Sequence, residues 1–139
     1  MKNTNILNTE IENTYFNIKI RQTDFALVKE NIIAKRYTIV NGNKLDLDLS
    51  FLVRSKLYSN DNNMVSGKVI DNGLIQYNHD FSFSIFTNKN ISGHRINDVE
   101  SCFREAVLTD KDYIGMSNDS AVSYNLGQLK SGDQIDFTL

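Results

Sequence analysis

The 139-residue chain contains no proline, no tryptophan and only one cysteine. Cys102 therefore has no partner for a disulfide within the chain, which fits a reducing compartment such as the cytoplasm. The apolar runs are far shorter than the roughly 20 residues that a membrane-spanning helix needs, so no membrane span is expected. The 15 basic residues are balanced by 17 acidic ones and form no basic patch, so no nucleic-acid partner is expected.

The N-terminal stretch also lacks an apolar segment. Residues 1–13 are polar and rich in asparagine, unlike a signal peptide. We expect them to form a flexible leader. The remaining residues, 14–139, have a length that suits a single domain with one core.

Alternation of apolar and polar residues is the dominant pattern, and it is clearest in Leu45–Val53. Side chains of a strand point to its two faces in turn, so the leucines share one face while Asp46 and Asp48 share the other. Tyr37–Val40 upstream is rich in β-forming residues, and the Asn41-Gly42 pair that follows is a hairpin signal. The stretch is therefore predicted to be one arm of a hairpin and a central strand, with its leucine face in the core.

Other short strands recur along the chain between clusters of turn residues. Residues 24–35 fit either a helix or two strands that turn at Glu30-Asn31, and the neighbouring strands favour the second interpretation. Asp71-Asn72-Gly73 is a second hairpin signal. Together these features predict a mainly β protein, an antiparallel β-sandwich. The further strands are expected at Tyr15–Gln22, Met64–Ile70, Leu74–Tyr77, Phe81–Phe86, Ala121–Leu126 and Gln134–Leu139.

One short helix is predicted near residues 96–107. Ile96, Val99 and Phe103 recur at helical spacing, and Asn97 with Glu100 is close to a capping box. Residues 102–108 fit a short strand equally well, so helix and strand both stay open there.

Five segments follow one another in an order that is found in a known family. They are Asp46–Val53, Ser59–Val65, Asp71–Asp80, Ala121–Leu129 and Gly132–Phe137. In this order they resemble the TerD-domain family of tellurium-resistance and stress-response proteins, from its DLD-containing strand to its final strand. The likeness runs from Tyr15 to Leu139 at low identity, and it implies a stress-response setting.

The resemblance also implies a metal. TerD domains bind calcium through a Gly- and Asp-rich loop that follows their GDN motif, whereas here Asp80 runs directly into Phe81-Ser82-Phe83. The chain thus looks like a shortened, divergent relative without the acidic calcium loop. A calcium site would consist of Asp46, Asp48 and Asp80, and because calcium takes about 6–8 oxygen ligands, most of its shell would be water. No cofactor is expected to be required, and calcium is the one candidate.

Other chemistry has weaker support in the sequence. Asp46 and Asp48 could form an acid–base pair, but we favour the interpretation that they lie on a solvated sheet face. Cys102 could act as a nucleophile with His94, and His79 could pair with Asp80. We interpret both histidines as surface loop residues and Cys102 as a buried thiol. No zinc, Walker A or dinucleotide-binding pattern is present, so the protein is not expected to be an enzyme.

Three hypotheses of function follow. The favoured one is a non-catalytic interaction module of a bacterial or phage stress-response, defence or secretion assembly. It would bind a protein partner, or itself, through exposed sheet edges. The second is a calcium-binding TerD-like stress protein using Asp46, Asp48 and Asp80. The third is a small enzyme that uses Cys102 and His94.

Overall fold

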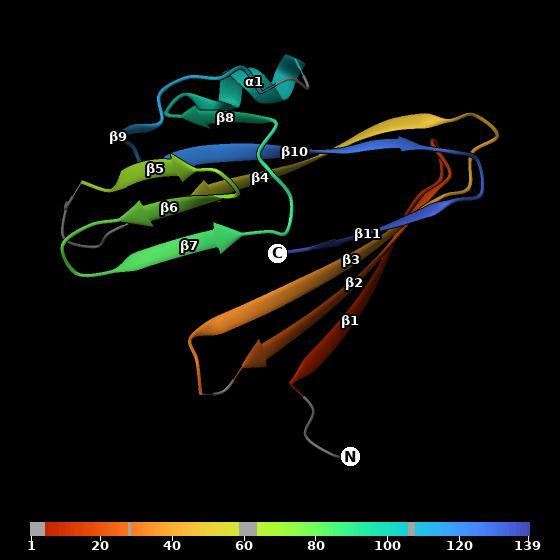
Figure 1. The fold of residues 1–139 in the computed structure, drawn as a ribbon, viewed down its shortest axis with the longest axis horizontal. Coiled ribbons are helices and arrows are strands. Elements are labelled where there is room, and N and C mark those ends of the chain that lie inside the picture. Colours follow the sequence, from red (N-terminus) through yellow and green to blue (C-terminus); the bar gives the residue numbers. More distant parts are fainter. Residues whose placement is uncertain (1–4, 28, 59–63, 106–107) are drawn as a thin grey trace. The chain divides into compact units, whose positions relative to one another are not determined.

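The computed structural model describes residues 5–27, 29–58, 64–105 and 108–139. Over these residues the protein is mainly β, with antiparallel strands in three sheets and one short helix (Figure 1). This confirms the mainly β, antiparallel β-sandwich fold with one short helix. Within the same residues, no helix is long and apolar enough to cross a membrane.

The chain forms two compact units. Unit 1 consists of Met1–Leu49 and Leu126–Leu139, and unit 2 consists of Ser50–Asn125. The boundaries fall inside two strands, β4 (Leu47–Lys56) and β10 (Asp119–Leu129), which therefore contribute to both units. A single domain over residues 14–139 stays a prediction.

Unit 1 is built on a four-stranded antiparallel sheet in the order β1-β2-β3-β11. Its strands are β1 (Ile6–Asn13), β2 (Ile18–Leu27), β3 (Ile32–Asn41) and β11 (Gln134–Thr138). A flexible leader is expected over residues 1–13, but β1 pairs with β2 along its whole length. The stretch is polar and was therefore expected to be flexible, but its polar residues are paired across the strands, for example Glu10 with Arg21.

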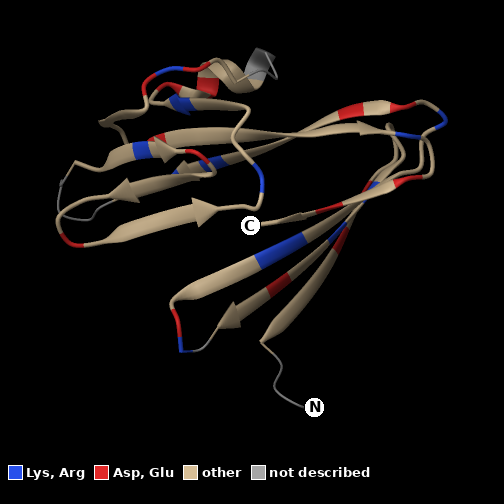
Figure 2. Ribbon diagram, viewed as in Figure 1, with Lys and Arg blue, Asp and Glu red and all other residues tan. Residues whose placement is uncertain are grey.

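One face of this sheet carries a row of isoleucines, next to the polar residues Gln22, Asp24 and Lys35. Ile20 lies opposite both Ile11 and Ile39, and Ile39 lies opposite Ile135, so a row of isoleucines crosses all four strands. In Figure 2 the basic and acidic residues are interspersed along the strands. Among the residues of unit 1 that the structure describes, the buried apolar ones are Ile39, Leu126, Leu129 and Phe137.

The predicted hairpin at Asn41-Gly42 is wrong. In the sheets, β3 pairs with β2 and β11, whereas β4 pairs with β10. The buried Asn41 amide donates to the carbonyl oxygens of Leu45 and Leu129, both at 2.9 Å, and so turns the chain out of the sheet. Gly42 is needed because a Cβ there would lie 2.8 Å from the carbonyl oxygen of Asn17.

The leucine face of Leu45–Val53 is only partly buried. Leu45 is 69% exposed, and Leu47 and Leu49 are half-buried. In the order β4-β10-β8, β4 is an end strand rather than a central one. The alternation therefore predicted the strand and its solvated aspartate face, but not the extent of burial.

Unit 2 consists of two sheets that face each other, with strand orders β4-β10-β8 and β7-β6-β5-β9. The fully buried Gln76 of β6 links them, because its Oε1 accepts from Ser55 Oγ at 2.6 Å and its Nε2 donates to Ser120 Oγ at 3.4 Å. The other elements are β5 (Ser66–Ile70), β6 (Gly73–Tyr77), β7 (Ser82–Phe86), β8 (Gly93–Ile96), α1 (Val99–Glu105) and β9 (Ile114–Met116).

The hairpin predicted at Asp71-Asn72-Gly73 is confirmed. Ile70 of β5 pairs with Gly73 of β6, and Asp71 and Asn72 form the turn between them. A Cβ at Gly73 would lie 2.3 Å from the carbonyl oxygen of Ile85, so no larger residue fits this strand start without a shift.

The two ambiguous segments are largely resolved. Residues 24–35 contain the end of β2 and the start of β3, as the interpretation as strands predicts. Residues 102–105 are helical and belong to α1. Residues 106–107, and the loop expected at residues 59–63, lie outside the described residues.

Candidate functional site

The residues predicted to bind calcium are exposed. Asp46 and Asp48 belong to unit 1, where the Asp46 carboxylate accepts a hydrogen bond from the Ser131 backbone N–H at 3.2 Å. Asp80 belongs to unit 2, and its Oδ1 lies 3.1 Å from His79 Nε2 in an exposed turn. No group of three or more His, Cys, Asp or Glu side chains in the described part of the chain could hold a metal ion. The calcium site stays a prediction.

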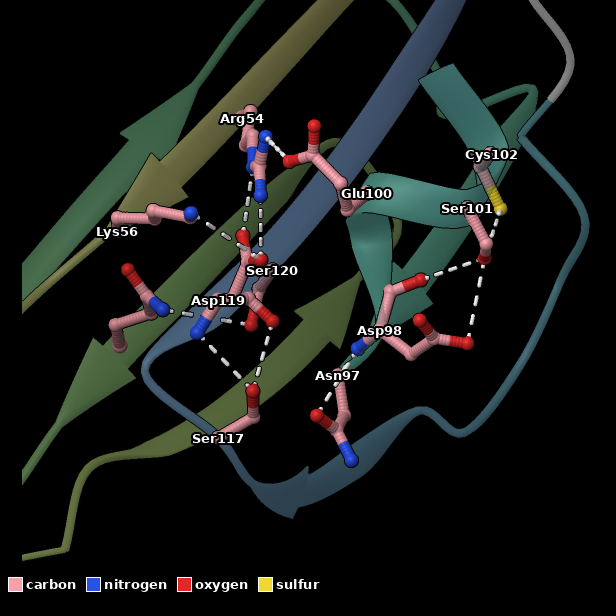
Figure 3. Close-up of polar contacts among 11 residues, drawn as sticks. Arg54, Lys56, Asn97, Asp98, Glu100, Ser101, Cys102, Ser117, Asp119 and Ser120 are labelled. Atoms are coloured by element: carbon pink, nitrogen blue, oxygen red, sulfur yellow. Dashed lines mark hydrogen bonds and ion pairs between the residues drawn. The ribbon is translucent and has the colours of Figure 1, made fainter. Parts of the chain in front are cut away.

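Cys102 lies on α1 and is buried, in agreement with its interpretation as a core thiol. Its Sγ is 3.7 Å from Thr109 Oγ1 and 4.0 Å from Ser101 Oγ (the contact with Ser101 is drawn in Figure 3). Burial raises the pKa of the Cys102 thiol, but hydrogen bonds from Thr109 and Ser101 and the charge of Arg95 lower it to a value below the ordinary one. None of the described hydrogen bonds joins Cys102 to His94, and the nucleophile–base pair considered above stays a prediction.

A cluster of charged side chains that the sequence did not reveal holds α1 against the sheet of β4 and β10 (Figure 3). The Arg54 guanidinium donates to both carboxylate oxygens of Asp119, at 2.8 and 2.7 Å, and to Glu100 of α1 at 2.7 Å. The hydrogen bonds with Asp119, and to a lesser extent the one with Glu100, raise the pKa of Arg54. The guanidinium also lies over the Phe103 ring, 5.0 Å from its centroid. Every charge in this cluster is paired, so we assign it a structural role.

An open pocket of about 420 Å³ lies entirely within unit 2. It is formed where the end of β5 and its turn meet the loop before β8 and the segment before β9. The polar side chains that line it come from Asp71, Asn90, Ser92, His94 and Asp110, and the ring of Tyr113 packs on that of His94.

His94 is the most buried polar residue of this pocket. Its side chain is only 4% exposed, and its Nδ1 lies 3.2 Å from Asp110 Oδ1. The same oxygen accepts the backbone N–H of His94 at 2.9 Å. The imidazole ring packs on Tyr113, with 4.2 Å between the ring centroids. One carboxylate therefore fixes both the backbone and the ring of His94.

The prediction that His94 is a surface loop residue is wrong. His94 lies on β8 opposite Val122 of β10 and is covered on that side. The preceding Gly93 allows close packing, since a Cβ there would lie 2.8 Å from both Leu108 O and Ser123 Oγ. No pattern in the sequence pointed to the pairing of His94 with Asp110.

The comparisons with protein families and with curated proteins found no match. The resemblance to the TerD-domain family therefore stays a prediction.

Proposed function

We propose that the protein is a non-catalytic interaction module that binds a protein partner by adding a strand to β1. The observation that carries the proposal is the state of β1: it lies at the end of its sheet, and all of its eight residues are exposed. No other described strand pairs with its outer edge. A free edge of this length offers unpaired backbone groups to an extended segment of another chain.

The two faces of β1 suggest which segment would fit. Leu7 and Ile11 lie on the face of the sheet that carries the isoleucine row, and both are exposed. Glu10 and Glu12 lie on the other face, where they pair with Arg21 and Lys19 at 3.4 and 3.6 Å. Opposite charges across strands are favourable. We therefore expect the partner strand to alternate apolar residues with lysine or arginine.

The biological setting of the proposal comes from the sequence. The TerD resemblance suggests a bacterial or phage stress-response, defence or secretion assembly, and the single cysteine suggests the cytoplasm. Self-association through the same edge is the alternative partner.

Substitution on the edge strand tests the proposal. A partner captured from the native host is purified, and its affinity is measured for the wild type, Thr9→Lys and Ser84→Lys. Thr9 lies in the middle of β1, and an added charge on an edge strand disfavours strand addition. Ser84 is the matched control, since it is exposed on β7, which also lies at the end of its sheet.

We expect Thr9→Lys to weaken binding at least tenfold, Ser84→Lys to leave it unchanged, and the partner to slow amide hydrogen exchange in β1. Equal affinity of the two variants, with slowed exchange confined to other strands, would contradict the proposal. A dimer in light scattering that only Thr9→Lys dissociates would assign the edge to self-association.

A further inference from the structure

We propose that the pocket beside His94 binds a small organic ammonium ion. Its volume of about 420 Å³ falls within the range of about 300–1,000 Å³ that is usual for small-molecule sites. The pocket belongs to unit 2, whereas β1 belongs to unit 1, so this site is independent of the proposed interaction edge.

The charge of the lining favours a cation. Asp71 and Asp110 both line the pocket, and no lysine or arginine is among the described residues that do so. Among the described residues, the Asp71 carboxylate forms no ion pair, and the Asp110 carboxylate forms one only with His94. Two carboxylates at one concave surface attract cations and repel anions.

His94 adds a directional acceptor. Because Asp110 occupies the Nδ1 side of the ring, Nε2 is the ring nitrogen left for a ligand. Among the described residues, none forms a hydrogen bond with Nε2. When the ring is neutral, Nε2 can accept an ammonium N–H of the ligand, and the Asp110 carboxylate would hold the ring in place for it.

The remaining walls suit the carbon part of the ligand. The Tyr113 ring is packed on His94 on one side and is 68% exposed overall. Cations bind over tyrosine rings at distances of up to about 6 Å. Val69 and Ile91 also line the pocket and offer apolar contact to an alkyl chain. Acidic, aromatic and apolar groups thus meet in one place, as an alkylammonium ligand requires.

An organic cation fits this site better than a metal ion. Metal sites usually need at least three protein ligands at short distances. In the part of the chain that the structure describes, no three His, Cys, Asp or Glu side chains are grouped in that way. An ammonium group needs only hydrogen-bond acceptors and a negative potential, which the pocket provides.

The test uses butylammonium as the probe, with 1-butanol and butyrate as uncharged and anionic controls of the same chain length. Binding is followed by NMR through the imidazole signals of His94 and the amide signals of Ser92 and Gly93. The exposed His79, outside the pocket, is the internal reference. We expect a saturable shift at His94 with butylammonium only, and no comparable shift at His79.

Variants then assign the binding to the pocket. The double variant Asp71→Asn/Asp110→Asn removes both charges while the asparagine oxygen can still accept from the His94 backbone. It is expected to raise the Kd for butylammonium at least tenfold, since hydrogen bonds to charged groups are stronger than those to neutral ones. Tyr113→Leu, at an exposed position, is expected to weaken binding several-fold. Asp48→Asn, an exposed carboxylate of unit 1, is the control and is expected to change nothing.

Three results would overturn the proposal: no saturable shift with butylammonium, an equal shift with 1-butanol or butyrate, or an unchanged Kd in both the double carboxylate variant and Tyr113→Leu. Because Tyr113→Leu leaves Asp71 and Asp110 in place, it tests the site even if the double variant does not fold.

Discussion

Arg54 and Asp119 are joined by two parallel hydrogen bonds, from Nε to Oδ1 at 2.8 Å and from Nη2 to Oδ2 at 2.7 Å. Both side chains are largely buried, with exposed fractions of 21% and 16%. A lysine presents one charge and cannot reproduce this planar fork.

The first prediction is therefore that Arg54→Lys lowers the melting temperature of the protein. Arg36→Lys is the matched control, because Arg36 forms a single, more exposed ion pair with Asp136. Exposed pairs contribute about 0–1 kcal/mol, so that control is expected to shift the melting temperature very little. Equal shifts for both variants in thermal denaturation would show that the fork adds no stability.

The buried link between the sheets of unit 2 leads to the second prediction. Gln76→Met leaves the Ser55 and Ser120 hydroxyls without the partners that Gln76 gives them. We expect a loss of roughly 2–4 kcal/mol in the free energy of unfolding, measured by chemical denaturation. Adding Ser55→Ala and Ser120→Ala is expected to restore part of it, since apolar groups need no partner. Gln128→Met, at an exposed position of β10, is the control.

The third prediction concerns pH. Burial raises the pKa of Tyr124 from 10.0 to about 12. Between these two values the unfolded chain releases the phenol proton while the folded chain keeps it, so the stabilisation present below pH 10 is lost as the pH rises toward 12. The full loss amounts to roughly 2–3 kcal/mol.

The measurement compares the wild type with Tyr124→Phe in urea denaturation at several alkaline pH values. Other titrating groups are the same in both proteins, so the difference in their free energies of unfolding isolates Tyr124. A difference that does not change with pH would contradict the assigned shift.

The fourth prediction is that Cys102 reacts slowly with a thiol reagent in the folded protein and rapidly after unfolding, because the side chain is buried. Thr109→Val removes a hydrogen bond that lowers the pKa of this thiol, so its pKa is expected to rise. The pH dependence of the alkylation rate measures it. Rapid alkylation of the folded wild type would instead favour the enzyme hypothesis.

The fifth prediction concerns calcium. Asp46 and Asp48 are exposed neighbours on β4 and its approach, and no described third ligand joins them. They would leave most of the coordination shell of calcium to water. We expect no heat in calorimetry and no rise in melting temperature at millimolar calcium. Heat and stabilisation that disappear in Asp46→Asn/Asp48→Asn would revive the calcium hypothesis.

Local chemistry explains which parts of the fold the sequence predicts. The turn at Asp71 and Asn72 joins strands that are adjacent in the chain, so the residues that cause it lie within it. The same reasoning fails at Asn41, because its amide bonds to Leu129, 88 residues further along the chain. No local pattern contains that contact, and without it Asn41-Gly42 looks like an ordinary hairpin.

For the candidate sites, too, local features were predicted and contacts between distant residues were not. Burial of Cys102 was predicted from its residue type and is confirmed. The pairing of Arg54 with Asp119 and of His94 with Asp110 joins residues 65 and 16 positions apart, and neither spacing is a known motif. Such pairs become visible only when the strands that carry them are placed side by side.

Unit 1 is made of two separate segments of the chain, Met1–Leu49 and Leu126–Leu139, so it can be completed only after the second segment has been synthesised. Phe137, which is 1% exposed, and Leu129, whose carbonyl binds Asn41, belong to the segment that completes this unit. On the ribosome that segment is made only after all of unit 2. The strands β1 to β3 must therefore wait for most of translation before β11 pairs with β3 and the Leu129 carbonyl accepts from the Asn41 amide.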